Sequence, residues 1–176
     1  MSKDTILINR APVLTLWAAV VAERMGFAWE EALSLGKTVA GLNAQAKGRA
    51  LGIFEPRPEK IKEARERKRG EEFWVQLCGR SVPAKNTADG VRAVTGNTPV
   101  GPQSVQRYLS QKFGEGFELV RNTMKELATA FEPQELAAQA FSLYEIFRPE
   151  VPRGRKGWGA KGVLDLDQIR SLAPGS

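Results

Sequence analysis

The chain of 176 residues contains no histidine and a single cysteine, and these shortages exclude the commonest catalytic and metal-binding sites. Histidine is the usual proton shuttle near neutral pH and the commonest metal ligand. Without it, the chain has no Ser-His-Asp triad and no Cys-His pair, and one thiol cannot build an ordinary structural zinc site. We therefore expect no enzymatic activity, no metal site and no cofactor, although carboxylate-and-cation chemistry stays open on composition.

Long apolar runs are also missing. No run approaches the roughly 18 residues of a membrane span, and the first ten residues, MSKDTILINR, lack the apolar core of a signal peptide. The lone cysteine forbids an internal disulfide, which fits a reducing compartment. We expect a globular, cytoplasmic protein of bacterial type that has no membrane partner.

Positive charge is what the chain has in excess. Its 26 Lys and Arg outnumber its 20 Asp and Glu, for a formal charge of +6. Arg57–Gly70 and Arg148–Lys161 each carry a local net charge of +4. An excess of this sign favours polyanionic partners, either nucleic acid or an acidic protein.

Composition changes along the chain divide it into four sections. Residues 1–54 are predicted to hold an extended arm and a helical pair, and residues 55–72 a charged linker. Residues 73–147 are predicted to form a hairpin followed by a helical unit, and residues 148–176 a basic tail with glycines and a tryptophan. The fold class that follows is mainly α with a short β-hairpin, with an α(+β) C-terminal unit.

Apolar residues at helical spacing predict five helices. The first starts at Pro12 and ends before Gly26, and the second begins near Trp29. The other three follow Pro102, begin near Phe117 and open at Pro133.

The β structure is expected to be small. Phe73–Cys78 is predicted to be a strand that turns at Gly79-Arg80 into a second strand over Ser81–Ala84. Pro83 would confine this second strand to a sheet edge, because proline cannot donate to a ladder. Asn86 or Thr87 is predicted to cap a short helix that reaches Val94.

The stretch from Ala18 to Leu42 has the spacing of a helix-turn-helix motif. Ala22 supplies the small residue of the first helix, Gly26 the turn and Leu35 an anchor of the second. Against DNA reading, the second helix opens with Glu30 and Glu31, which repel phosphates. The alternative is a plain helical hairpin.

The same stretch also resembles ubiquitin-associated three-helix domains, through Met25-Gly26-Phe27 and the following Glu31-Ala32-Leu33. The resemblance covers the loop and second helix of those modules. It implies binding of a protein partner through an exposed Met-Gly-Phe loop.

Basic and polar side chains of the second helix, the linker and the tail are the candidates for nucleic-acid contact. Lysine and arginine neutralise phosphates, and a tryptophan can stack on a base. The residues predicted to bind nucleic acid are Lys37, Gln45, Lys47, Arg49, Arg65, Arg67, Lys68, Arg69, Arg153, Arg155, Lys156, Trp158 and Lys161. The other interpretation of the tail is that Trp158 docks onto the protein itself.

Catalytic candidates are few. Cys78 stands two residues from Arg80, which could activate a thiol, but a buried apolar role is favoured. Neither Glu30-Glu31 nor Asp165 and Asp167 has the spacing of a metal site. The sequence thus predicts a non-enzymatic basic binding protein, nucleic-acid-binding or regulatory. The alternative is a protein-interaction or self-associating adaptor module.

Overall fold

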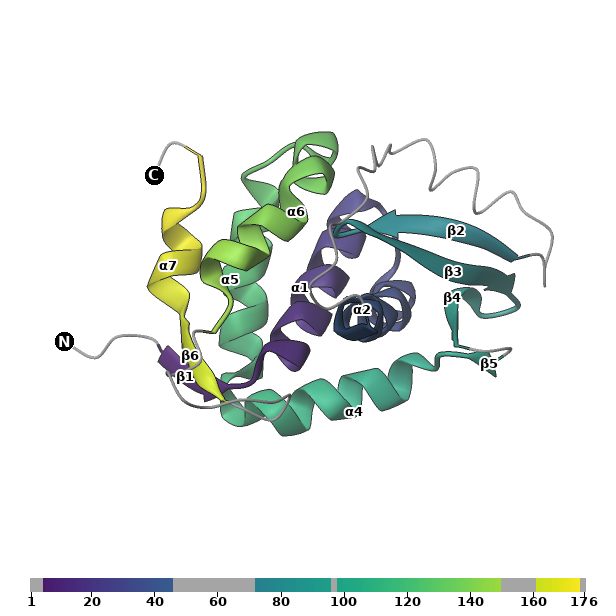
Figure 1. The fold of residues 1–176 in the computed structure, drawn as a ribbon, viewed down its shortest axis with the longest axis horizontal. Coiled ribbons are helices and arrows are strands. Elements are labelled where there is room, and N and C mark those ends of the chain that lie inside the picture. Colours follow the sequence, from purple (N-terminus) through teal and green to yellow (C-terminus); the bar gives the residue numbers. More distant parts are fainter. Residues whose placement is uncertain (1–4, 46–71, 96–97, 150–160, 175–176) are drawn as a thin grey trace.

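The computed structural model describes residues 5–45, 72–95, 98–149 and 161–174 (Figure 1). The helices are α1 (Arg10–Met25), α2 (Trp29–Gln45), α4 (Pro102–Phe113), α5 (Phe117–Thr129), α6 (Pro133–Phe147) and α7 (Leu166–Ser171), with a 3-10 turn at Gly114–Gly116. The strands are β1 (Thr5–Ile8), β2 (Glu72–Leu77), β3 (Arg80–Thr87), β4 (Gly90–Thr95), β5 (Thr98–Pro99) and β6 (Gly162–Asp165).

Helix α1 forms the centre of the core. It packs against α2, α4, α5, α6 and β2. Every residue from Pro12 to Ala22 is buried, including Thr15, whose hydroxyl donates to the carbonyl of Ala11. A helix that is apolar on all sides is stable only when it is covered on all sides. Helix α1 is therefore buried along most of its length by the elements around it.

The five helices predicted from apolar spacing are present, and their ends follow from the residues that mark them. Gly26 ends α1 with φ at 119°, a left-handed conformation that glycine adopts without steric cost. Pro102 and Pro133 occupy the first turns of α4 and α6, where the missing amide is not needed. The indole of Trp17 donates to the carbonyl of Ala140, which ties α1 to α6.

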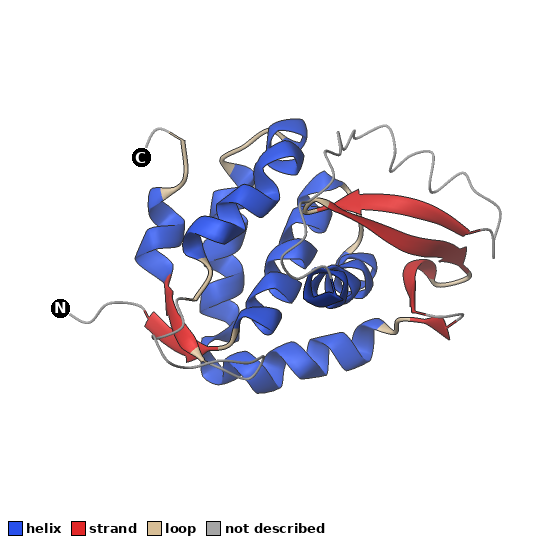
Figure 2. Ribbon diagram, in the orientation of Figure 1, coloured by secondary structure: helices blue, strands red, loops and turns tan. Residues whose placement is uncertain are grey.

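The β structure corrects the predicted fold class. The chain forms a four-stranded antiparallel sheet in the order β2-β3-β4-β5 and a separate two-stranded sheet of β1 and β6, at opposite ends of the molecule (Figure 2). A mainly α fold with one short hairpin is therefore wrong. The first hairpin is present, but two further strands extend it.

The predicted short helix up to Val94 is also wrong, because this stretch is the β3–β4 hairpin. Thr87 pairs with Gly90 across a two-residue loop. The hydroxyl of Thr87 accepts from the amide of Asp89 and donates to the carbonyl of Gly90. Gly90 has φ at 113°. Asp-Gly is a strong hairpin signal, and it prevails here over helix capping by Asn86 or Thr87.

Pro83 lies in an inner strand, contrary to the edge position that we predicted. It pairs with Trp74 of β2, whereas the β3–β4 pairing begins one residue later, at Ala84 and Ala93. Pro83 therefore stands in the half of β3 that has a single strand neighbour. The missing amide costs no ladder hydrogen bond towards β4.

The two-stranded sheet joins the two ends of the described chain. β1 and β6 pair antiparallel, with Leu7 opposite Val163 and Ile6 opposite Leu164. Leu164 is buried, while Leu7 and Val163 are exposed on the outer face. Strand β6 was not predicted in the basic tail, and α7 follows it directly. In the described ranges no helix has both the length and the apolarity needed to cross a bilayer.

Candidate nucleic-acid interface

Three of the residues predicted to bind nucleic acid fall within the described chain. Lys37 is exposed on α2, Gln45 is the last residue of that helix, and Lys161 is exposed immediately before β6. The others, in residues 46–71 and 150–160, lie outside the described residues. They are Lys47, Arg49, Arg65, Arg67, Lys68, Arg69, Arg153, Arg155, Lys156 and Trp158. Their assignment to nucleic acid stays a prediction.

The positive charge is distributed unevenly between the described and the remaining residues. The described ranges hold thirteen basic and thirteen acidic side chains, so their formal charges cancel. Residues 46–71 hold nine basic and five acidic residues, and residues 150–160 hold three and one. The excess of +6 therefore belongs to these two segments.

Helix α2 does not have the exposure of a DNA-reading helix. Residues 31–36 and 38–40 are buried, because α2 packs against α1, α4, β3 and β4. Between Glu30 and Gly41 only Lys37 is exposed. Entry of this helix into a groove would require its separation from the core. Residues 18–42 therefore form a helical hairpin of the core.

The large apolar side chains at the loop between α1 and α2 are also buried, whereas the resemblance to ubiquitin-associated domains implies an exposed loop. Met25 and Phe27 are buried, at 9% and 3% exposure. The amides of Gly26 and Phe27 donate to carbonyls of the last turn of α1. The apolar side chains of this loop are thus part of the core and are not presented to a partner.

Cys78 is a core residue. It is 1% exposed, and burial raises the pKa of its thiol to about 12. Its φ is 49° and that of Gly79 is 75°, so both lie in the left-handed region that a type I′ hairpin turn requires. The prediction that Cys78 is a buried apolar residue is confirmed. Across the described residues no three Cys, Asp or Glu side chains gather in a way that could hold a metal ion.

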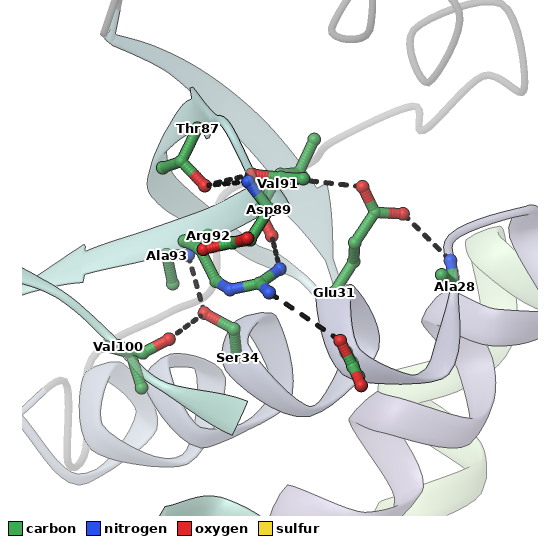
Figure 3. A network of polar contacts seen from close by, with 11 residues as sticks. Ala28, Glu31, Ser34, Thr87, Asp89, Val91, Arg92, Ala93 and Val100 are labelled. Atoms are coloured by element: carbon green, nitrogen blue, oxygen red, sulfur yellow. Dashed lines mark hydrogen bonds and ion pairs between the residues drawn. The ribbon is translucent and has the colours of Figure 1, made fainter. Parts of the chain in front are cut away.

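A polar network fixes α2 to β4 (Figure 3). The buried carboxylate of Glu31 accepts from the amide of Ala28 through Oε1 and from the amide of Val91 through Oε2, each at 2.9 Å. The amide of Ala93 donates to Oγ of Ser34 at 2.8 Å. Val91 and Ala93 are two residues apart on the strand, and Glu31 and Ser34 are about one turn apart on the helix. Side chains of the helix therefore accept the hydrogen bonds of two strand amides that a neighbouring strand would otherwise accept.

The same network fixes the start of α4. The hydroxyl of Ser34 donates to the carbonyl of Val100 at 2.7 Å, and the amide of Val100 donates to the carbonyl of Ala93 at 2.8 Å. Val100 comes two residues before α4. Arg92, 7% exposed, lies 3.8 Å from the carboxylate of Glu30 and donates to the carbonyl of Val91. The backbone immediately before α4 is thus held at Val100 by contacts with Ser34 and Ala93.

Helix α4 has two faces of opposite character. Pro102, Val105, Leu109 and Phe113 are buried. The other face exposes only polar and basic side chains: Gln103, Ser104, Arg107, Ser110, Gln111 and Lys112. No acidic residue occurs in the helix. Figure 1 shows α4 along one side of the molecule.

Gln103, Arg107 and Gln111 form a row on the exposed face that is slightly inclined to the helix axis, and we call it the α4 ridge. They are spaced four residues apart, so each lies one turn after the last, with roughly 6 Å between neighbours. Glutamine and arginine side chains can make paired hydrogen bonds with a planar partner. The ridge therefore presents three such groups in a line.

Aromatic and basic residues lie on both sides of the ridge. On one side, Nζ of Lys37 lies 3.9 Å from the ring centroid of Tyr108. Partial burial of the Lys37 ammonium group lowers its pKa, and the positive charge of Lys112 lowers it further. On the other side, the indole of Trp29 donates to Gln106, and the guanidinium of Arg121 lies 3.9 Å from the centroid of the Trp29 ring.

The contact between Lys37 and Tyr108 brings together the two longest acid-free stretches of the chain. No Asp or Glu stands between Asp89 and Glu115, and none between Glu31 and Glu55. In the fold α2 packs against α4. On this side α4 and the part of α2 after Glu31 therefore present lysine, arginine and neutral polar groups to a polyanion, and no acidic side chain.

The α4 ridge was not predicted from the sequence, because the density of basic residues points to the linker and the tail, and α4 was recognised only by its apolar stripe. The composition of this helix nevertheless indicates a surface for an anionic partner. The polar positions of the helix are restricted to Gln, Ser, Arg and Lys in a chain that has 20 acidic residues.

Comparison with known proteins gives no guide to function: no family model, no curated protein and no solved structure matches the chain.

Proposed function

We propose that this protein is a non-enzymatic nucleic-acid-binding protein of the cytoplasm, with a regulatory role. The observation that carries the proposal is the exposed face of α4, which has hydrogen-bonding and basic groups and no acid along its whole length. Groups of this kind contact phosphates and base edges in protein–nucleic-acid complexes.

The basic segments complement this face. Because the described ranges are formally neutral, residues 46–71 and 150–160 supply the charge that draws a polyanion towards the protein. In this proposal, Arg65, Arg67, Lys68, Arg69 and the basic residues of the tail neutralise phosphates. The α4 face provides the contacts that orient the complex.

Fluorescence anisotropy of labelled duplex and single-stranded probes, titrated with the full chain over a range of salt concentrations, tests the proposal. The expected result is binding at low salt, with log K falling linearly as log salt rises, because phosphate contacts release counterions. Failure to bind any probe at low salt, or binding with no salt slope, contradicts it.

A second candidate function is self-association or binding of a protein partner, and Trp74 favours it. This side chain is 66% exposed on β2, which is a terminal strand of the four-stranded sheet. An exposed aromatic on a terminal strand is suited to strand addition, because in the described part of the chain β2 pairs with β3 alone. Light scattering of the wild type and of a Trp74→Thr variant tests this function. A concentration-dependent dimer that the substitution removes supports it, and a monomer at every concentration contradicts it.

A further inference from the structure

From the α4 ridge we infer that the ligand is double-stranded DNA, with α4 in the major groove and Gln103, Arg107 and Gln111 reading base edges. The inference rests on the proposed function, and it adds the class of nucleic acid, the element that enters the groove and the residues that determine specificity.

The dimensions of α4 agree with this placement. The helix has 12 residues, a length of roughly 18 Å. The major groove of B-form DNA is about 12 Å wide and admits one α-helix, whereas the major groove of A-form RNA is too deep and narrow for side chains to read. The element that lies on the surface is thus of a kind that duplex DNA accepts and duplex RNA excludes.

The chemistry of the ridge matches base edges better than phosphates. Arginine pairs with the O6 and N7 atoms of guanine, and glutamine with the N6 and N7 atoms of adenine. A surface built only to neutralise phosphates has no need of glutamine. At the centre of the ridge stands Arg107, with Gln103 and Gln111 one turn away on either side. This spacing brings the three side chains to different base pairs.

Single-stranded nucleic acid fits this face less well, because single-strand sites use exposed aromatic platforms on which bases stack. The aromatic residues of α4 are not available for stacking. Phe113 is buried, and the half-buried ring of Tyr108 has Lys37 over it. Trp29, on the other side of the ridge, is partly buried and has Arg121 against its ring.

The position of α4 is also fixed before a ligand arrives. Ser34 joins Ala93 of β4 to Val100, and the apolar stripe of α4 packs against α1 and α2. A ridge whose backbone is already held loses little conformational freedom on binding, so its hydrogen bonds can distinguish base pairs.

The test begins with selection of binding sites by the full chain from a pool of DNA duplexes with a randomised centre, followed by anisotropy on the selected duplex. Single-stranded DNA and duplex RNA of the same sequence serve as competing probes, and polyglutamate serves as a polyanion without bases. We expect an enriched motif, and tighter binding of the selected duplex DNA than of either competitor.

Substitutions at the centre of the ridge then separate base reading from charge. Arg107→Lys keeps the charge but loses the planar fork. It should keep most of the affinity for unselected duplex and lose about tenfold to a hundredfold of discrimination at one base pair. Arg107→Ala should lose the same discrimination and some general affinity. Arg107 is exposed, so both variants are expected to fold, which circular dichroism checks.

Two matched controls lie on other helices. Lys125→Ala on α5 removes the same charge from an exposed position, and Gln139→Ala on α6 removes an exposed glutamine. Neither should change the motif. The inference is overturned if Arg107→Lys and Arg107→Ala select the wild-type motif. It is also overturned if the wild type binds single strands, duplex RNA or polyglutamate as tightly as its best duplex. If the wild type binds no nucleic acid at all, the proposed function itself has failed.

Discussion

Lys37 of α2 lies over the ring of Tyr108 of α4, with 3.9 Å between Nζ and the ring centroid. The contact joins two acid-free stretches that are far apart in the sequence, and it stands beside the α4 ridge. A lysine predicted from the sequence to bind nucleic acid thereby meets a surface that the sequence did not predict.

The close approach of α1 and α2 predicts opposite effects for two glycines of α2. A Cβ at Gly36 would lie 2.6 Å from the carbonyl oxygen of Thr15, whereas one at Gly41 would meet nothing within 4 Å. Gly36→Ala should cost about 1–3 kcal/mol in the free energy of unfolding, because two backbones must separate. Gly41→Ala should add about 0.5–1 kcal/mol through helix propensity. Urea unfolding measures both, and equal effects of the two substitutions would refute this packing.

The carboxylate of Glu31 predicts a second loss of stability. Glu31→Gln removes one of the two oxygens that accept from Ala28 and Val91, and it places an amide donor in a buried site. We expect the free energy of unfolding to fall by about 1–3 kcal/mol. The control is Glu126→Gln, an exposed position on α5, which should change it by less than about 0.5 kcal/mol. A Glu31 variant as stable as the control would argue against the network.

Alkaline conditions should destabilise the fold. Burial raises the pKa of Cys78 from 9.0 to about 12 and that of Tyr144 from 10.0 to about 12. The folded state therefore holds these protons where the unfolded state has released them. The resulting stability is complete below pH 9 and is lost as pH rises towards 12. Urea unfolding across this range measures the decline, which Cys78→Ala should make shallower. Stability that stays constant above pH 9 would contradict the burial of both groups.

The uneven distribution of charge predicts that the basic segments determine the salt dependence of binding. Replacing Arg65, Arg67, Lys68 and Arg69 by glutamine should reduce the slope of log K against log salt by about 0.9 for each phosphate that is no longer neutralised. A variant with residues 65–69 in scrambled order keeps the charge and should bind as the wild type does. If the glutamine variant retains the full slope, these residues do not contact phosphates.

The helices could be predicted from the sequence because each depends on neighbouring residues. Pro102, Pro133 and Gly26 mark the ends, and apolar stripes mark the buried faces. The sheet was harder to predict, since its pairing is decided by distant contacts. The pairing of Leu7 with Val163 joins opposite ends of the chain, and nothing in either strand alone specifies the other. Between Thr87 and Gly90 a helix-cap signal and a turn signal overlap, and the prediction of a cap was wrong.

The candidate site was predicted only in part for a related reason. Lys37 could be identified by charge, because it is the lone cation in a small, polar stretch of α2. The ridge on α4 depends on which face of that helix is covered, and this is settled by packing against α1 and α2. Sequence alone places Gln103, Arg107 and Gln111 on one side of a helix, but the fold determines that this side is exposed.

Binding of duplex DNA through α4 can be observed by NMR, from the amide chemical shifts of the labelled full chain while the duplex is added. We expect the largest changes on amides of α4, between Gln103 and Phe113, and on Lys37 of α2. The amides of α6, on another side of the core, should change little. Changes confined to β2 around Trp74, with α4 unchanged, would show that the strand edge is the binding surface and that α4 is not.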